Sequence, residues 1–387
     1  MTRFVLGIIM VIAGWAGLAA PVHARADGSP RVLFVLATDG PEDAYWYRDL
    51  DTHSRNAADA LDMTVERLWA GLERPAILAA VEDRLQTEPV PDYIVFANQR
   101  GLGPRLLKLA DAHGVDAFLY VAPLLDADWD ALGGPRGELE HWIGELIPDD
   151  EQAGYDLATR LFKAARDRDG TDTPIRAVAL HGRRATTSSS ERAKGFRRAV
   201  ADTPDVEFLQ GVSARWSAET AALKYWRLRQ RYGRIDVVWA ANDPMAMGVV
   251  DSHMPGMALP VIGGVDWETP ALDAIADGRL HTSMGGHVYD IAWVLALLKA
   301  HHEGRDFAER LGTASLTSRL SALDASDPDP ELAHDAFARA LRAVAADPAR
   351  LGTPAFDHFE GLADADPATS PWGERLRETF MAPGAFR

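Results

Sequence analysis

Short apolar runs alternate along this chain with longer stretches in which apolar residues recur every three or four positions. The runs have the length of buried strands and lie at residues 32–37, 94–97, 117–121, 177–181, 235–240 and 261–265. The stretches between them have helical periodicity and lie at residues 45–61, 74–85, 102–113, 191–201 and 218–231. Because strands that alternate with helices are typical of parallel sheets, the pattern predicts an α/β fold.

Two interruptions of this alternation predict crossings between two lobes. Residues 133–150 contain Gly-Gly-Pro, a polar Glu-Leu-Glu-His-Trp stretch that we expect to be exposed, and Pro-Asp-Asp before a new helix. Met284-Gly285-Gly286-His287 precedes a long apolar helix at 288–301. We therefore expect a first lobe of residues 31–145 with 287–313 and a second lobe of residues 146–286 with 314–325. Residues 326–387 differ in composition and predict a C-terminal helical extension.

The N-terminus has the pattern of a cleavable secretory signal at residues 1–24. Arg3 precedes an apolar run, and Val22-His23-Ala24 ends the segment with the form of a processing site. An uncleaved membrane anchor is the alternative, but no second apolar segment of that length follows. We therefore expect an exported protein.

Composition narrows the possible functions further. The chain contains no cysteine, which excludes disulfides, thiolate metal sites and cysteine nucleophiles. Its formal net charge is −17, and no basic patch is evident, so we expect no nucleic-acid partner.

One strand end stands out for its chemistry. The apolar run at residues 235–240 passes abruptly to Asn242-Asp243 and then to a helix start at Pro244. Asp243 before a proline has the pattern of an N-cap, which would leave the Asn242 amide facing a crevice. Open parallel sheets bind ligands at this edge.

Three motifs resemble the sugar-binding type I periplasmic binding proteins, the family that includes the ribose and galactose receptors. They are Ala241-Asn242-Asp243-Pro-Met-Ala-Met-Gly248, Gly264-Val265-Asp266 with the 271–280 helix, and Glu191-Arg192-Ala-Lys-Gly195-Phe196. The resemblance covers residues 31–325 and implies two lobes, each a doubly wound parallel sheet, hinged by about three crossing segments. Residues 44–49 and 204–208 are similar to the periplasmic autoinducer receptor of this family, which works with a sensor kinase.

The resemblance implies a cleft between the lobes that holds a small polar ligand. The implied ligand-binding residues are Asp43, Tyr45, Trp46, Asn98, Arg192, Trp216, Asn242 and Asp266. Trp46 and Trp216 would stack on the ligand, and Arg192 would donate to two adjacent oxygens. The alternatives are that Tyr45 packs into its lobe, that Asn98 only forms a turn, and that Arg192 makes a helix-face ion pair.

Two positions depart from the family pattern. The polar pair expected after the fourth strand is replaced by Leu119-Tyr120-Val121-Ala122, and the polar residue expected at the second crossing is Gly286. Two hydrogen-bond partners are therefore missing, which argues against ribose, galactose and the autoinducer. We expect a bulkier or less hydroxylated ligand that fills the space near Val121 and Gly286.

Enzymatic alternatives find little support in the motifs. No Gly-x-Gly-x-x-Gly follows a strand, no Gly-x-Ser-x-Gly elbow is present, and His301-His302 lacks the acid spacing of a metal site. We therefore expect no catalysis, no cofactor and no metal, and a secreted Rossmann-like enzyme remains a distant alternative.

The resemblance leaves two roles open for a periplasmic receptor. The first is a solute-binding protein that captures a sugar-like ligand and delivers it to the membrane permease of an ABC transporter. The second is a ligand-sensing receptor that signals through a membrane sensor kinase or cyclase. In either role we expect a monomer.

Overall fold

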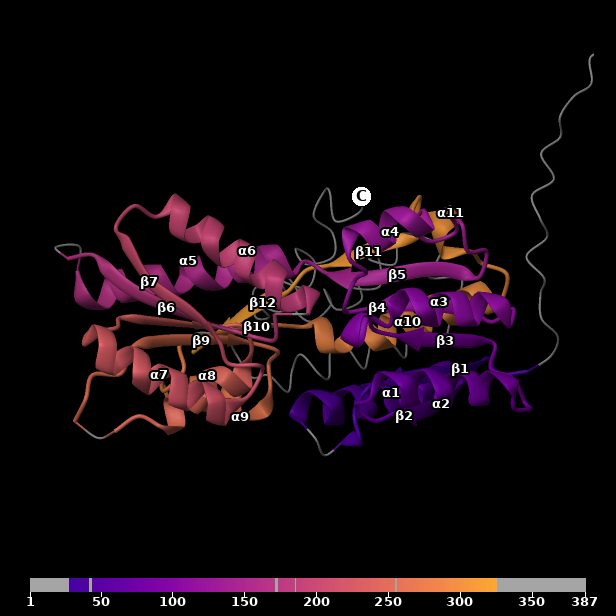
Figure 1. Ribbon diagram of the computed structural model, residues 1–387, viewed down its shortest axis with the longest axis horizontal. Helices are drawn as coiled ribbons and strands as arrows, with labels where there is room; N and C mark the ends of the chain where they lie inside the picture. Colours follow the sequence, from indigo (N-terminus) through magenta and orange to yellow (C-terminus); the bar gives the residue numbers. More distant parts are fainter. Residues whose placement is uncertain (1–27, 42–43, 171–172, 185, 255, 326–387) are drawn as a thin grey trace, which may run out of the picture.

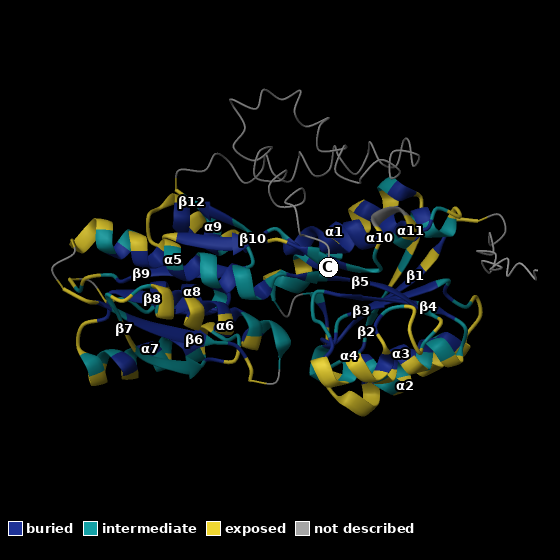
Figure 2. Ribbon diagram, turned by 90° about the horizontal axis from the view of Figure 1, so that it is seen from above, coloured by how far each residue is buried: buried dark blue, intermediate teal, exposed yellow. Residues whose placement is uncertain are grey.

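The computed structural model describes residues 28–41, 44–170, 173–184, 186–254 and 256–325 and shows two lobes side by side (Figure 1). Each lobe is built on one six-stranded sheet. In the first lobe, helices α1 and α10 lie on one face of the sheet and helices α2, α3 and α4 lie on the other (Figure 2). Asp43, the predicted signal segment 1–24 and the predicted extension 326–387 lie outside the described residues.

The first sheet has the strand order β11-β5-β4-β3-β1-β2, and all its neighbouring strands are parallel. The elements of this lobe are β1 (Arg31–Leu36), α1 (Tyr45–Leu61), β2 (Thr64–Trp69), α2 (Arg74–Gln86), β3 (Tyr93–Phe96), η2 (Gln99–Gly101), α3 (Gly103–Ala112), β4 (Asp116–Tyr120), α4 (Asp126–Leu132), β5 (Trp142–Pro148), η3 (His287–Tyr289), α10 (Asp290–His302), α11 (Phe307–Leu311) and β11 (Ser315–Ser318).

The second sheet has the strand order β12-β10-β9-β8-β6-β7, in which only the β10–β12 pair is antiparallel. The elements of this lobe are α5 (Asp150–Asp169), β6 (Ile175–His181), α6 (Thr187–Asp202), β7 (Val206–Ser213), α7 (Ala218–Tyr232), β8 (Val237–Ala240), α8 (Asp243–Asp251), β9 (Val261–Val265), α9 (Thr269–Ala276), β10 (Thr282–Gly285) and β12 (Ser321–Asp324). Among the described residues, no helix combines the length and the apolar character needed to span a bilayer.

The strands that the sequence predicts are largely buried in the sheets, but β5 and β10 are buried too and lie where the sequence predicts crossings. All residues of β3, β8 and β9 are buried, because helices cover both faces of the sheet there. The edge strands β2 and β7 are half exposed and carry polar residues, so their sequences lack a continuous apolar run. The prediction that the stretch ending at Trp142 is exposed was wrong for this residue, since Trp142 is fully buried and begins β5.

Three crossings join the lobes. The first follows β5, the second follows β10, and the third lies between β11 and β12. The sequence placed residues 314–325 in the second lobe, but β11 pairs with β5 in the first sheet, so the third crossing lies at residues 319–320. Parallel pairing with β5 brings the first and third crossings together, and the Asp149 amide donates to the Ser318 carbonyl (2.7 Å).

A buried carboxyl ties the second crossing to the third. Asp290, at the start of α10, is almost completely buried and accepts a hydrogen bond from the Ser318 hydroxyl (2.6 Å). Burial raises the pKa of Asp290 to about 8, although the Ser318 bond opposes this rise. The three crossings therefore form one hydrogen-bonded unit rather than three separate linkers.

Helices α5 and α6 pack against each other with backbone contact. A Cβ atom on Gly195 would lie 1.8 Å from the Glu151 carbonyl oxygen, and one on Gly154 would lie 2.1 Å from the Arg192 carbonyl oxygen. Neither position can therefore hold a side chain unless the helices separate. This pair of glycines sets the position of Arg192 relative to the start of α5.

We predict that Gly195→Ala lowers the free energy of unfolding by at least about 1–3 kcal/mol, the usual effect of overpacking a well-packed contact. Urea unfolding followed by circular dichroism measures the change. Gly28→Ala is the matched control, because no atom lies within 4 Å of a Cβ atom at that position. Equal stability of the two variants would contradict the proposed helix contact.

Candidate ligand-binding site

The carboxyl ends of both sheets face the crossings. Strand β5 of the first sheet and strand β10 of the second both end where the chain changes lobe, and their parallel neighbours end at the same edges. Several residues just beyond these strand ends have left-handed backbone conformations that residues other than glycine rarely adopt: Val121, Arg215, Trp216, Asp266 and Trp267. Such strain is typical of functional sites, and here it gathers at the predicted ligand edge.

Arg192, on the inner face of α6, is the centre of this region. Its side chain is 5% exposed, and its Nε atom donates to Asp150 Oδ1 (2.6 Å). Its Nη1 atom donates to the Ala241 carbonyl (2.7 Å) and to Asp266 Oδ1 (3.3 Å). The guanidinium thus joins the start of α5, the end of β8 and the end of β9. Arg192 therefore does not make the ion pair on the helix surface that the sequence left as an alternative.

His287 adds the second crossing to the same cluster. Its Nε2 atom lies 3.3 Å from Arg192 Nη2 and 3.4 Å from Asp266 Oδ1, and the residue is 1% exposed. The indole of Trp46, from α1 of the first lobe, lies on the His287 ring with 4.8 Å between ring centroids. Both lobes and a crossing therefore meet at this point.

The N-cap of α8 is Asn242 and not Asp243, which the sequence predicted. The Asn242 Oδ1 atom accepts from the Met245 amide (3.1 Å). Asp243 is the first helical residue and turns inward, where it accepts from the Glu268 amide (3.0 Å) and from the Ser283 hydroxyl (2.8 Å). Burial, reinforced by neighbouring Asp266, raises the pKa of Asp243 to about 8.

The other predicted residues differ in their surroundings. Asn98 uses both ends of its amide within the first lobe, since Oδ1 accepts from the Gly103 amide (2.8 Å) and Nδ2 donates to the Pro123 carbonyl (2.9 Å). This is the turn-forming alternative. Tyr45 is 41% exposed, and the Arg48 guanidinium lies over its ring, so it does not pack into its lobe.

Trp216 lies in the turn that follows β7, one residue before Ser217, which caps α7 as the sequence predicts. Its backbone is left-handed, with φ of 69°. Its indole covers Gly182 so closely that a Cβ atom there would lie 2.1 Å away. The side chain is half buried and packs against the core of the second lobe.

Two residues next to Asp266 were missed by the sequence reasoning. Trp267 donates its indole N–H to the Ser283 carbonyl (3.0 Å) and covers Gly285 and Gly286. The space beside Gly286, which we expected a bulky ligand to fill, is therefore filled by the protein's own indole. The signal that could have revealed this is the Gly-Gly pair at the end of β10, since such pairs often mark the close approach of a large group.

Glu268 is the second missed residue, and it also touches both lobes. It is 4% exposed and follows β9 of the second lobe, yet its carboxyl receives a hydrogen bond from the backbone N–H of Trp46 in the first lobe. Burial raises the pKa of Glu268 to about 9, with further contributions from Asp266 and Asp243, while the Trp46 bond lowers it.

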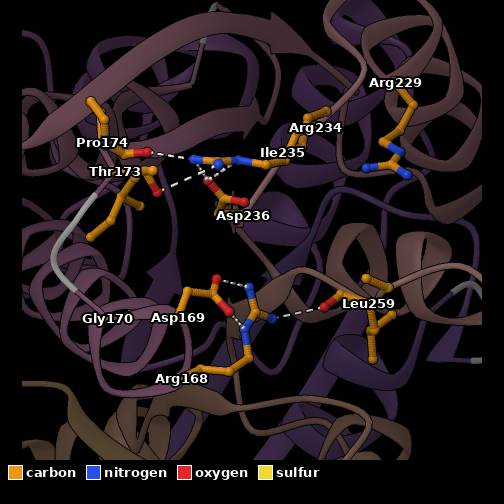
Figure 3. Close-up of a pocket in the computed structure, with 12 residues that line it drawn as sticks. Arg168, Asp169, Gly170, Thr173, Pro174, Arg229, Arg234, Ile235, Asp236 and Leu259 are labelled. Atoms are coloured by element: carbon orange, nitrogen blue, oxygen red, sulfur yellow. Dashed lines mark hydrogen bonds and ion pairs between the residues drawn. The ribbon is translucent and has the colours of Figure 1, made fainter.

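A cavity of about 580 Å³ lies elsewhere in the second lobe (Figure 3). Its lining includes Ile175, Asp236 and Leu259, which lie at the amino ends of β6, β8 and β9. Because these are the amino ends of the strands, the cavity lies at the opposite sheet edge from the Arg192 cluster. Two of its arginines are already engaged, since Arg168 pairs with Asp169 and Arg234 pairs with Asp236.

Within the described part of the chain, no group of three or more His, Asp or Glu side chains is arranged to hold a metal.

We predict that Arg192→Ala lowers the free energy of unfolding by about 3–5 kcal/mol, because it leaves the buried carboxylates of Asp150 and Asp266 without their cation. Chemical unfolding of the purified variant measures this loss. Arg198→Ala, further along the same helix, removes only surface contacts with Glu151, Gln152 and the Tyr155 ring, and it should change stability by less than about 1 kcal/mol. Comparable losses in both variants would contradict a central role for Arg192.

We predict a pH dependence of stability that Glu268 helps to produce. The folded protein holds this proton more tightly than the unfolded chain, whose glutamate pKa is near 4.5. The free energy of unfolding therefore falls as pH rises from about 5 towards 9, by at most about 1.4 kcal/mol per pH unit for one group. Asp243 and Asp290, with pKa values of about 8, titrate in the same range.

Glu268→Gln cannot ionise, so its unfolding free energy should decline less steeply over this range than that of the wild type. Urea titrations at a series of pH values measure the slope. Glu219→Gln, an exposed change in the first turn of α7, should keep the wild-type slope. Parallel profiles for Glu268→Gln and the wild type would rule out this assignment.

Comparisons with known proteins agree with this architecture. Residues 146–306 match the family model described as a periplasmic binding protein domain. The xylitol-binding protein of Mycolicibacterium smegmatis is 28% identical over 248 residues, which cover 62% of this chain and 65% of that protein. The D-apiose import binding protein of Paraburkholderia graminis is 26% identical over 170 residues, which cover 44% of this chain and 49% of that protein. The matches thus span between about half and two thirds of these relatives.

A solved structure extends the similarity over more of the chain. The periplasmic sugar-binding protein from Pseudomonas fluorescens is 26% identical, with a TM-score of 0.67, and the alignment covers 81% of this chain and 91% of that chain. This similarity includes both lobes, whereas the family model covers mainly the second. Taken with the three crossings and the facing strand ends, these matches show that the chain has the two-lobed fold of the type I periplasmic binding proteins.

Proposed function

We propose that this protein captures a small, neutral, sugar-like or polyol ligand between its lobes in the periplasm and delivers it to an ABC transporter. The observation that carries this proposal is the cluster of Arg192, Asp266 and His287, covered by Trp46, where the two lobes meet. The xylitol and D-apiose proteins among the relatives support the same class of ligand.

The groups in the cluster suit a polyhydroxylated molecule. A guanidinium and a carboxylate side by side can donate to and accept from neighbouring hydroxyl groups, and the indole of Trp46 offers a flat face to C–H bonds. Among the described residues, the Asn242 amide nitrogen has no acceptor once its oxygen caps α8, so we assign it to the ligand. We assign Trp216 to a wall of the site and set Asn98 aside, because the Asn98 amide is engaged at both ends.

Ligand binding is coupled to movement of the lobes in this proposal. A ligand that contacts Trp46 in the first lobe and Asp266 in the second binds the closed conformer better than an open one. It therefore shifts the population towards closure by its difference in affinity. The three hydrogen-bonded crossings provide the hinge. No step of catalysis is needed, and we assign the chain no cofactor.

We assign delivery to the permease of an ABC transporter because one relative is an import protein. The same closed conformer would also serve a receptor that contacts a membrane sensor kinase or cyclase. We propose that the protein acts as a monomer after removal of its signal segment. Co-purification of the tagged protein with membrane proteins from its own cells shows whether its partner is a transporter permease or a membrane sensor.

We predict that a screen of pentitols, hexitols, pentoses and hexoses finds compounds that raise the melting temperature. Calorimetry should then show that Asp266→Asn weakens binding by roughly a hundredfold, because charge-assisted hydrogen bonds contribute about 1.5–3 kcal/mol each. Arg198→Ala should bind as the wild type does. The proposal fails if none of these compounds binds, or if Asp266→Asn binds them with unchanged affinity.

A further inference from the structure

We infer that Trp267 limits the length of the ligand by closing the end of the site beside the second crossing. This inference rests on the proposed function, since it concerns the molecule held by Arg192 and Asp266. It assigns a preference for short polyols and their aldoses over six-carbon ones.

A turn with left-handed backbone conformations places Trp267 at the carboxyl edge of the second sheet. Asp266 and Trp267 directly follow β9 and have φ values of 123° and 59°, both in the left-handed region. The Asp266 amide remains tied to the Met284 carbonyl (2.7 Å), so the chain turns within these residues. A ligand that contacts the Asp266 carboxylate therefore lies next to residue 267 as well.

The indole is held firmly in that position. Its Nε1–H group donates to the Ser283 carbonyl (3.0 Å), and its five-membered ring lies against Gly285, where a Cβ atom would be 2.2 Å away. The far edge of its six-membered ring lies 3.7 Å from a Cβ atom built on Gly286. The two glycines at the end of β10 thus form a bed for the ring, and Gly285 in particular has no room for a side chain.

Trp267 also spans the two lobes. It comes from the second lobe and contacts Leu323 there, yet it packs against the main apolar core of the first lobe. A side chain of structural value to one lobe alone would not need contacts with both. The indole therefore occupies part of the space between the lobes in this conformer, and it does so beside the crossing where the family pattern led us to expect a polar ligand contact.

The test is calorimetry of wild-type protein, Trp267→Phe and Trp267→Ala with erythritol, xylitol and D-sorbitol, together with the matching aldoses. We expect the wild type to bind a four- or five-carbon compound at least tenfold more tightly than its six-carbon homologue. In Trp267→Ala this ratio should fall at least tenfold, because the vacated space admits the longer chain. For Trp267→Phe we expect an affinity ratio between those of the wild type and Trp267→Ala.

Trp226→Ala is the matched control, because that indole also donates to a backbone carbonyl of the second lobe but lies on α7. It should keep the wild-type ratio, and circular dichroism checks that each variant is folded. If the wild type binds these compounds and Trp267→Ala leaves the ratio unchanged, the length limit is wrong while the proposed function stands. If the wild type binds none of them, the length limit is wrong, and the wider screen of pentitols, hexitols, pentoses and hexoses decides the proposed function.

Discussion

A single buried guanidinium determines how the centre of this molecule is assembled. Removing the charge of Arg192 from water is unfavourable unless its donors find partners, and those partners come from the start of α5, the end of β8, the end of β9 and the second crossing. None of these segments can move far without leaving a buried charge unpaired. The glycine contact between α5 and α6 serves the same end, since it fixes the helix that carries Arg192.

Strain and close packing gather at the same edge of the sheets. The left-handed residues after β7 and β9 are Arg215-Trp216 and Asp266-Trp267, and both tryptophans lie on glycines of a neighbouring strand end, Gly182 and Gly285. An ordinary strand end needs neither left-handed residues nor a tryptophan packed on a glycine. Because the surrounding core is well packed, it can hold these residues in positions that would relax in a flexible loop. The aromatic surfaces of the second lobe are thereby fixed before any ligand arrives.

The sequence predicted the fold better than it predicted the site. Central strands such as β8 and β9 are buried on both faces, so their apolar runs are easy to recognise, whereas edge strands such as β2 lack that signal. Arg192 and Asp266 were found from their motifs. The partners Asp150 and His287 were not, because they lie 42 and 95 residues from Arg192 in the chain and meet it only in the folded structure. Asn242 was placed correctly at its strand end but given the wrong cap role.

The balance of charge around Arg192 also bears on the kind of ligand that fits. Asp150, Asp243 and Asp266 are all largely buried near one guanidinium, and Glu268 is buried close to Asp243 and Asp266. Burial raises the pKa of Asp243 to about 8 and that of Glu268 to about 9. These two carboxyls are therefore mostly protonated at neutral pH, which lets them lie close to Asp266 without repulsion. An anionic ligand would add negative charge to a cluster in which the Arg192 guanidinium is already shared by two carboxylates. A neutral polyhydroxylated ligand adds none, and its hydroxyl groups can both donate to Asp266 and accept from Arg192.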